Sequence, residues 1–273
     1  MSAASEGLAD AGSVGGEEAD LERRFAGLRR LYGDDGYRLL RAARVALVGV
    51  GGVGSWAAEA LARCGVAGLT LIDLDHVSES NIHRQVQARG ATVGQAKVLA
   101  LRERLADIHP GCDVQAVEEF VDAANWPALL PQPVDVVIDA CDGIGAKLTL
   151  AAWAMRSGVP FVGVGAAGGK LSAQAVAVDD LAHVTHDPLL ASLRQRLRRD
   201  HGAPRGGEAM GLRCVYSKER VHRPADGGDV DGSLNCAGYG STVTVTATFG
   251  LVAAGEAVRQ LLWALPALRS RWL

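Results

Sequence analysis

Five polar residues between positions 73 and 142 are of types that could together bind and activate a nucleoside triphosphate: Asp73, Asn81, Arg84, Lys97 and Asp142. Arginine and lysine would neutralise the triphosphate and the charge of an in-line transition state at the α-phosphate of ATP. A carboxylate would hold the Mg²⁺ that bridges the leaving pyrophosphate. A dinucleotide dehydrogenase has no comparable need for such a carboxylate beside an arginine and a lysine.

A glycine-rich turn precedes these residues and indicates where a nucleotide would bind. Residues 45–48 predict a buried strand, and a helix is expected to begin near Ser55. Asp73 closes the next predicted strand, 24 residues after Gly49, where a ribose-binding carboxylate is expected. The glycines let the backbone approach a phosphate chain, while the helix N-terminus offers N–H groups to the anion; they are Gly49, Gly51, Gly52 and Gly54.

Predicted strands and helices alternate along most of the chain. The pattern indicates a parallel sheet with right-handed crossovers, whose carboxyl edge would gather the polar residues in one cleft. Strands are expected at 45–48, 69–72, 113–117, 134–139 and 160–164, and helices at 21–43, 92–108 and 144–157. Beyond Gly165 we expect an antiparallel strand at 171–178, a helix at 186–200, a strand at 213–217 and a helix at 242–262. The fold class is therefore α/β: a Rossmann-like, doubly wound, mainly parallel sheet with a C-terminal antiparallel and helical extension.

The composition is that of an ordinary soluble α/β protein. Of the 273 residues, 48% are apolar and 22% are charged, and the net charge of −3 means that a nucleic acid would need a local basic patch. No stretch reaches the roughly 18 apolar residues of a membrane-spanning helix, so we expect no membrane association. The five cysteines form no CxxC pair, which argues against a zinc site or a disulfide scaffold and fits a cytoplasmic location. Residues 1–20 are expected to be a disordered acidic tail.

Several short motifs carry a family resemblance: the Gly-x-Gly-Gly-x-Gly turn, Asp73-x-Asp75, Ser80-Asn81-x-x-Arg84-Gln85, Val93-Gly94-x-x-Lys97 and Asp139-x-x-Asp142. They resemble the ubiquitin-activating-type (ThiF/MoeB-like) adenylating superfamily, which includes enzymes that activate the sulfur carriers of thiamine and molybdopterin synthesis. The resemblance implies that Asp73 holds the ribose, that Asp142 binds Mg²⁺, and that the phosphates are gripped by Asn81, Arg84 and Lys97. The residues implied to be catalytic are Arg84, Lys97 and Asp142. Gly143 departs from the pattern, because many members have Asn there.

A closer resemblance covers roughly residues 23–255. It rests on Arg24-Phe25, Arg30-Leu-Tyr-Gly33, residues 52–63, Gly165-Ala-Ala-Gly168-Gly169, Asp187-Pro188-Leu189, Cys214-Val-Tyr-Ser217 and residues 235–250. These segments look like the tRNA threonylcarbamoyladenosine dehydratases. In that family ATP activates the threonyl carboxylate of the modified adenosine next to the anticodon. The neighbouring carbamoyl nitrogen then attacks the acyl-adenylate, which closes a ring and releases AMP.

The resemblance also implies an organisation and partners. A single ATP-binding adenylating domain would span 21–273, with 170–240 as an extension that faces the substrate tRNA. The cofactors would be ATP and Mg²⁺, and the nucleic-acid partner a tRNA that carries threonylcarbamoyladenosine. A homodimer is expected, and the superfamily suggests Arg24 as a residue that reaches the phosphates of the partner subunit. A cysteine desulfurase or sulfur-acceptor system is raised as a further partner.

Other interpretations stay open at this point. The same chemistry could adenylate the C-terminus of a small sulfur-carrier protein, although the paired CxxC motifs common in that branch are absent. The glycine turn alone would also suit an NAD-dependent dehydrogenase, and a non-catalytic tRNA-binding protein could have kept a relic nucleotide fold.

Individual residues have simpler alternatives as well. Arg84 could be a surface ion-pair partner, and Cys236 could be a buried small hydrophobic residue, since ring closure needs no enzyme thiol. The glycines of 165–169 could let the backbone approach the substrate or could form a plain tight turn. One run of cations on the helix at 186–200 could contact tRNA or form a solvated helix face: Arg194, Arg196, Arg198 and Arg199.

Overall fold

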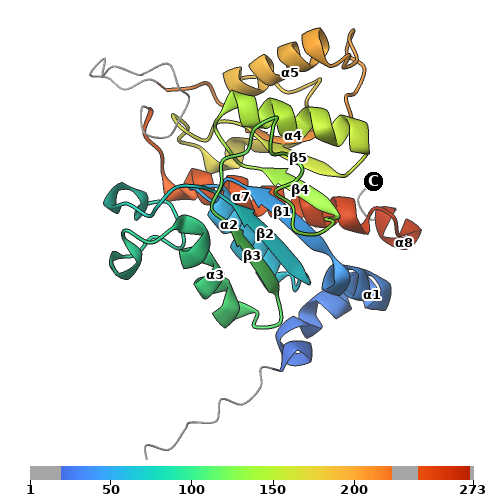
Figure 1. The fold of residues 1–273 in the computed structure, drawn as a ribbon. Helices are drawn as coiled ribbons and strands as arrows, with labels where there is room; N and C mark the ends of the chain where they lie inside the picture. Colours follow the sequence, from blue (N-terminus) through green and yellow to red (C-terminus); the bar gives the residue numbers. More distant parts are fainter. Residues whose placement is uncertain (1–19, 223–238, 271–273) are drawn as a thin grey trace, which may run out of the picture.

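The computed structural model describes residues 20–222 and 239–270, which form a seven-stranded sheet with helices on both faces (Figure 1). The strand order is β3-β2-β1-β4-β5-β7-β6, and all neighbours are parallel except the β6–β7 pair. This arrangement confirms the predicted fold class. The strands are β1 (Arg44–Val48), β2 (Gly68–Ile72), β3 (Asp113–Val117), β4 (Val136–Asp139), β5 (Phe161–Val164), β6 (Val176–Asp180) and β7 (Arg213–Ser217).

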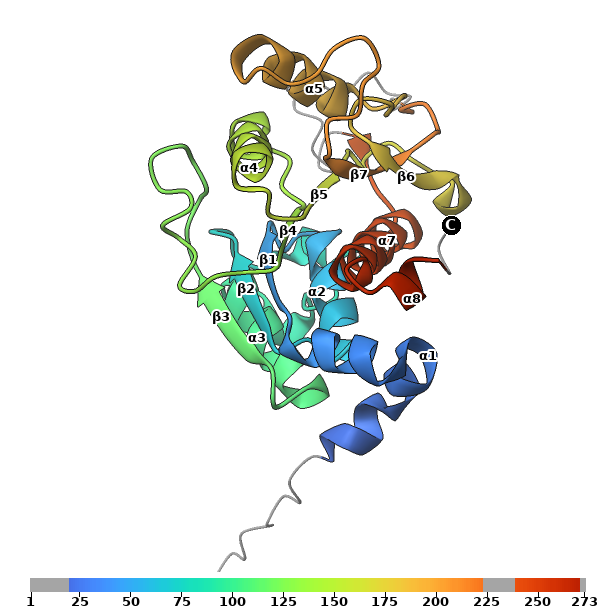
Figure 2. The ribbon, with the colours of Figure 1, turned by 90° about the vertical axis from the view of Figure 1, so that its right-hand side faces the viewer.

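The helices form two layers, one on each face of the sheet (Figure 2). Alternation along β1 sends Val45 and Leu47 into one core and Ala46 and Val48 into the other. The first core is covered by α1 (Leu21–Ala42), α2 (Gly54–Arg63), α3 (Lys97–Ile108), α7 (Val243–Leu262) and α8 (Pro266–Arg269). The second is covered by α4 (Ile144–Ser157) and α5 (Pro188–Asp200).

Helices α2 and α7 pack closely at Gly250, which has no side chain. A Cβ at this position would meet the Trp56 side chain at 2.8 Å and the Ala57 nitrogen at 3.0 Å. Helix α7, from the C-terminal part of the chain, thus packs directly against the N-terminus of α2, which follows the glycine turn.

Two predicted elements begin later than the sequence pattern suggested. The helix expected from Thr92 begins at Lys97, because Gly94 adopts a positive φ of 89° that breaks helical geometry. The strand expected from Leu171 begins at Val176. The backbone N–H groups of Leu171 and Ser172 donate to the Glu219 carboxylate instead of to a strand ladder. The remaining boundaries lie within two residues of the expected ones.

Two expectations fall largely outside the described part of the chain. The acidic tail at 1–20 is described only at Asp20, whose side chain accepts from the Arg23 N–H and caps α1. Cys236 lies entirely outside the described residues. Among the helices of residues 20–222 and 239–270, none has the length and apolar character that a membrane crossing requires.

Candidate functional site

A cavity of about 460 Å³ opens at the carboxyl ends of β1, β2, β4 and β5. Its size is within the range of small-molecule binding sites, and it lies where open α/β sheets bind ligands. All but one of the residues predicted for the site line it: Gly49, Gly51, Gly52, Asp73, Asn81, Arg84, Lys97 and Asp142. Folding therefore brings together residues that are spread over 94 positions of the chain, from 49 to 142.

Two glycines of the turn are required by close backbone packing. Gly49 has a φ of 84°, and a Cβ there would lie 2.9 Å from the backbone of Ala140 and Cys141. A Cβ on Gly54 would overlap the Gly49 carbonyl oxygen. Gly54, the one predicted residue that does not line the cavity, thus acts by letting α2 begin directly against the turn. Gly51 is different, because a Cβ there would meet only the Gln85 amide nitrogen, at 3.9 Å.

Asp73 holds the turn in place while facing the cavity. Its Oδ2 accepts from the Val50 N–H at 2.7 Å, and its Oδ1 accepts from the Asp75 N–H at 2.9 Å. Burial raises the pKa of the Asp73 carboxyl, and the nearby Lys97 ammonium offsets part of that effect. Each carboxylate oxygen has more than one lone pair, so Asp73 can still accept from ribose hydroxyls.

Lys97 forms an ion pair at the start of α3. Its Nζ lies 2.6 Å from Oδ2 of Asp75, and the lysine side chain is 9% exposed whereas that of Asp75 is 71% exposed. A lysine in the first turn of a helix is unfavourable for the helix dipole, and Asp75 explains part of its presence there. The ammonium has three donors, so two remain after this contact for phosphate oxygens in the cavity.

Arg84 lies across the glycine turn. Its Cδ would be 3.2 Å from a Cβ on Gly52, and its Nη1 donates to the Ser80 carbonyl oxygen at 2.8 Å. The Trp56 indole N–H, from α2, donates to the Arg84 carbonyl oxygen at 2.9 Å. Arg84 has no carboxylate partner among the described residues, so the alternative of a surface ion pair finds no support.

Asn81 serves the local turn that presents Arg84. The Asn81 Oδ1 accepts from the Ser78 N–H at 3.1 Å, and the Asn81 side chain is buried. Its backbone carbonyl accepts from the Arg84 and Gln85 N–H groups. Asn81 therefore orders the segment between β2 and α3 as well as lining the cavity.

Asp142 is available to bind a magnesium ion. It is exposed at the cavity, and no hydrogen-bond or ion-pair partner is found for it among residues 20–222 and 239–270. The same residues contain no cluster of three or more His, Cys, Asp or Glu side chains that could hold a metal. Mg²⁺ is commonly held by one or two carboxylates together with substrate phosphates and water. The donors present therefore fit a Mg²⁺ ion shared with a nucleotide.

A buried ion pair beneath the cavity was not anticipated as part of the site. Asp139, at the end of β4, lies 2.9 Å from Lys147 Nζ, and both side chains are fully buried. Lys147 also donates to the Val164 carbonyl oxygen at 2.9 Å, and Asp139 Oδ1 accepts from the Cys141 N–H at 3.2 Å. Asp139 is thus unavailable to a ligand and instead shapes the loop that carries Asp142. A lysine near the start of a mostly apolar helix was the available signal in the sequence.

Asp187 holds the other wall of the cavity. Its buried carboxylate accepts from the Ala166 N–H at 2.8 Å and caps α5 through the Leu190 N–H at 2.9 Å. Burial raises the pKa of this carboxyl. A Cβ on Gly165 would overlap the Asp187 carboxylate, so glycine is required there for packing.

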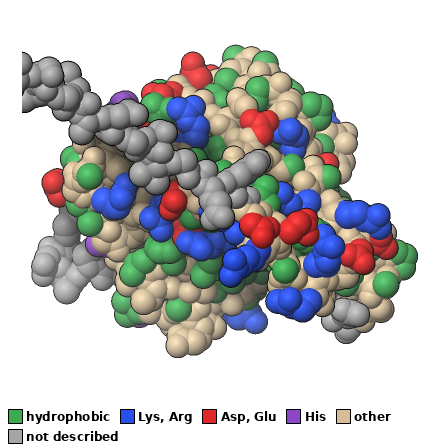
Figure 3. Space-filling model, turned by 90° about the horizontal axis from the view of Figure 1, so that it is seen from below, with side chains coloured by type: hydrophobic (Ala, Val, Ile, Leu, Met, Phe, Trp, Pro, Cys, Tyr) green, Lys and Arg blue, Asp and Glu red, His purple; other side chains and the backbone are tan. Residues whose placement is uncertain are grey.

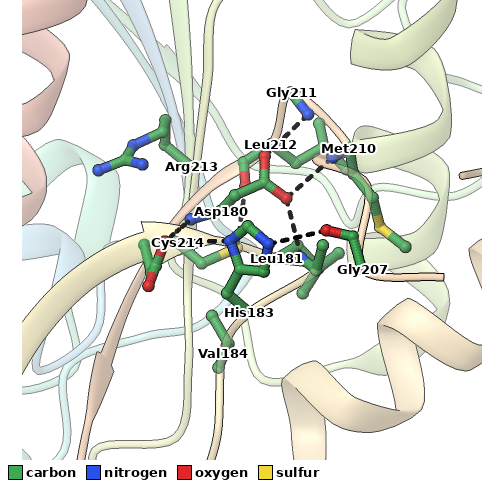
Figure 4. A network of polar contacts seen from close by, with 12 residues as sticks. Asp180, Leu181, His183, Val184, Gly207, Met210, Gly211, Leu212, Arg213 and Cys214 are labelled. Carbon is green, nitrogen blue, oxygen red and sulfur yellow. Dashed lines mark hydrogen bonds and ion pairs between the residues drawn. The ribbon is translucent and has the colours of Figure 1, made fainter. Parts of the chain in front are cut away.

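The loops around β6 and β7 are tied together by a polar network (Figure 4). The Asp180 carboxylate accepts from the N–H groups of Ala182, Met210 and Gly211, at 2.8 to 2.9 Å. The His183 ring lies 2.9 Å from the Gly207 carbonyl oxygen. This network anchors the segment that leads to Asp187 and thereby the wall formed by Gly165 and Ala166.

The arginines of α5 are largely occupied within the protein. Arg194 donates to the Leu181 and Val184 carbonyl oxygens, at 3.0 and 2.8 Å. Arg198 donates to the Pro204 carbonyl oxygen, and Arg199 pairs with Asp200. These contacts give Arg194, Arg198 and Arg199 a structural role. A contact between this helix and tRNA stays a prediction, and Arg196 is the arginine best placed to make it.

Arg24 lies at the end of α3 in this chain. Its Nη1 donates to the Asp107 and Ile108 carbonyl oxygens, at 2.9 and 2.7 Å. It satisfies carbonyl groups at the helix C-terminus and does not line the cavity of its own chain.

Comparison with known proteins places this geometry in a family. The ThiF family model matches residues 22–271. The tRNA threonylcarbamoyladenosine dehydratase of Escherichia coli is 40% identical over 251 residues, which cover 88% of this chain and 94% of the relative. The Haemophilus influenzae enzyme of the same name is 36% identical over 247 residues, covering 89% and 95%. The crystal structure of the E. coli enzyme in complex with ATP superposes with a TM-score of 0.82 at 38% identity, covering 93% of this chain and 98% of that one.

Proposed function

This chain belongs to the ThiF family and, within it, to the tRNA threonylcarbamoyladenosine dehydratases, and on that premise we propose that it catalyses the ATP-dependent cyclisation of threonylcarbamoyladenosine in tRNA, next to the anticodon. The observation that carries the proposal is that the glycine turn, Asp73 and the cations Arg84 and Lys97 meet in one cavity. The proposal is also supported by the similarity to the E. coli enzyme, whose crystal structure contains ATP.

The reaction proceeds in two displacements. The threonyl carboxylate attacks the α-phosphate of ATP, and the bond to pyrophosphate breaks. The carbamoyl nitrogen then attacks the acyl carbon, loses its proton and displaces AMP, which keeps one former carboxylate oxygen. The net change in the nucleoside is loss of water, and no enzyme thiol is consumed.

The residues of the cavity have distinct roles in this proposal. Arg84 and Lys97 stabilise negative charge on the phosphates in the first displacement, because they are preorganised by contacts to Ser80 and Asp75. Asp73 accepts from the ribose hydroxyls, and Asn81 contributes to the phosphate side. Asp142 would hold Mg²⁺, which supplies Lewis-acid neutralisation of the triphosphate when bound.

Binding of tRNA to a chain of net charge −3 requires a local concentration of cations. On the lower side of the molecule, Lys and Arg side chains gather in a band interrupted by acidic residues (Figure 3). Helix α1 lies at this side in Figure 1, and its exposed cations besides Arg24 are Arg23, Arg29, Arg30 and Arg38. Arg29 pairs with Glu22 and Arg38 with Asp35, so a bound phosphate would compete with these carboxylates. We assign the phosphate backbone of tRNA to this surface, with 170–240 as the extension of a single adenylating domain (21–273) that faces the modified nucleoside.

A homodimer in the cytoplasm is part of the proposal. Helix α7 is mostly buried but exposes Val243 and Leu251 on one side, which is a surface that a second copy would cover. In such a dimer the Arg24 guanidinium would reach the ATP phosphates bound by the partner subunit. It would then give up its hydrogen bonds to the carbonyl groups at the end of α3. A sulfur-transfer partner is not required, because ring closure supplies its own nucleophile.

The test is a reconstitution with purified protein, ATP, Mg²⁺ and tRNA that carries threonylcarbamoyladenosine. We expect AMP and pyrophosphate in equal amounts and a nucleoside lighter by one water in mass spectrometry. Pyrophosphate exchange that depends on a sulfur-carrier protein instead of tRNA would contradict the proposal. That outcome would favour the activity named for the E. coli molybdopterin-synthase adenylyltransferase, which is 41% identical over 128 residues, or 47% of this chain.

A further inference from the structure

One aromatic side chain at the cavity is left exposed. Phe120, on the loop after β3, is 61% exposed and lines the cavity. The other aromatic side chains of residues 20–222 and 239–270 are buried or half-buried. A flat ligand that covered this ring would remove apolar area from water, so the position of Phe120 at the cavity favours such an occupant.

The loop that carries Phe120 is rigidly anchored. Its neighbour Val121 is buried in the core under α4, as is Trp126, whose ring meets that of Trp153 edge-on at 5.3 Å. The Asn125 side-chain amide donates to the Phe120 carbonyl oxygen at 2.7 Å. Because Val121 fills the core position, the adjacent Phe120 is held on the cavity side.

The surroundings of the ring suit a flat aromatic ligand. Phe120 Cζ would be 3.8 Å from a Cβ on Gly143, so the ring reaches toward the loop that carries Asp142. Leu74, 53% exposed, is a second exposed apolar side chain at the cavity and directly follows Asp73. Strand β2, which ends beside Asp73, pairs with β3, which leads to Phe120. Leu74 and Phe120 therefore form an apolar edge of the cavity next to Asp73, the carboxylate assigned to the ribose.

We propose that Phe120 is a stacking platform for an adenine base. The inference rests on the proposed function, in which two adenines enter the reaction: that of ATP and that of the modified nucleoside. Both present the same π-face, and a base on the ribose held by Asp73 would lie toward Leu74 and Phe120. Stacking on an aromatic side chain is tolerant of sequence and adds affinity without hydrogen bonds.

The experiment compares Phe120→Ala and Phe120→Trp in the full-length protein. Binding of ATP and of tripolyphosphate is measured by calorimetry, and the KM for modified tRNA is measured from AMP release. Val93→Ala is the matched control, because Val93 is an exposed apolar residue that neither lines the cavity nor belongs to the extension at 170–240. An unchanged thermal unfolding midpoint will show that Phe120→Ala folds normally.

If the adenine of ATP is the occupant, Phe120→Ala will weaken ATP binding about tenfold or more and leave tripolyphosphate binding unchanged. Phe120→Trp will retain ATP binding, because the indole ring can still stack on the base. With the target base as the occupant, ATP binding is unchanged and the KM for tRNA rises by a similar factor. Unchanged binding of both ligands would overturn the platform, as would an equal loss of ATP and tripolyphosphate. Wild-type protein that binds ATP but forms no AMP with modified tRNA would overturn the proposed function, and the ATP titration would still decide the platform.

Discussion

Lys147 and Asp139 form an ion pair, 2.9 Å long and fully buried, between the sheet and the floor of the nucleotide cavity. Burial by itself would lower the pKa of Lys147, but the adjacent Asp139 carboxylate raises it, so the lysine stays charged. The pair joins the end of β4 to the end of β5 through the Val164 carbonyl oxygen. The two loops that follow these strands are therefore held relative to one another by one ammonium group.

Replacing Lys147 with Met should be strongly destabilising. The Asp139 carboxylate would remain buried without its cation, which typically costs about 3–5 kcal/mol. Urea unfolding monitored by circular dichroism will measure the change. The double variant Asp139→Asn/Lys147→Met should recover much of the loss, because no unpaired charge is then buried. A single variant within about 1 kcal/mol of the wild type would contradict this account.

Replacing Arg84 with Ala should lower kcat/KM for AMP formation by about 100- to 1,000-fold, because a preorganised charge-stabilising donor is lost. Arg84→Lys should be intermediate, since it keeps the charge but not the planar fork. Arg102→Ala, an exposed arginine on α3, is the control and should be silent. Comparable activity of Arg84→Ala and Arg102→Ala would remove Arg84 from the mechanism.

Asp142→Asn should raise the Mg²⁺ concentration needed for half-maximal AMP formation by more than about tenfold, since the carboxylate that fits the metal is neutralised. The fold should be unaffected because Asp142 is exposed. The measurement is a magnesium titration at saturating ATP. An unaltered titration curve would show that the metal is held by other groups.

Gly165→Ala should destabilise the protein by about 1–3 kcal/mol, because the added Cβ would overlap the Asp187 carboxylate. It should also raise the KM for tRNA, since Ala166 and Ala167 line the cavity. Gly145→Ala is the matched control, because Gly145 is an exposed position in the first turn of α4 and nothing lies within 4 Å of the new Cβ. That control should be neutral or stabilising by up to about 1 kcal/mol, because alanine favours helix. Equal unfolding midpoints for the two variants would refute the packing argument.

Stability should fall as the pH drops below 6.5 because of His109. Burial and the Arg41 guanidinium, whose Nη1 lies 2.6 Å from His109 Nε2, lower the pKa of His109 from 6.5 to about 4. Between these values the unfolded chain binds a proton that the folded chain does not, so the stabilisation present above pH 6.5 is lost progressively toward pH 4. The contribution is at most about 3 kcal/mol.

The measurement is urea unfolding of wild type and His109→Gln at pH 7.5 and pH 5. Glutamine keeps an acceptor for Arg41 but does not titrate in this range. The variant should therefore lose less stability than the wild type between the two pH values. Parallel losses would show that other groups, such as the paired carboxylates, account for the whole effect.

Local sequence was sufficient for the fold class and for eight of the nine residues predicted at the nucleotide cavity, although other lining residues such as Phe120 were not anticipated. The strand, glycine turn and helix around Gly49 follow from short-range sterics, and the carboxyl ends of parallel strands must meet at one edge of the sheet. For that reason Asp73, Arg84, Lys97 and Asp142 could be assigned to one cleft from their positions relative to predicted strands. Their catalytic and metal-binding roles stay predictions.

Only the tertiary structure decided how each polar group is used. Asp139 and Asp142 look equivalent in the sequence. In the structure the Asp139 carboxylate is buried in an ion pair with Lys147, whereas Asp142 lines the cavity. Arg194 and Arg198 resemble a nucleic-acid-binding run, but loop carbonyl groups occupy them. Phe120 could have been a core residue, and it is exposed because Val121 takes the core position. These outcomes depend on which distant segments pack together, and that information is absent from local spacing because partners such as Arg24 and Ile108 lie 84 residues apart in the chain.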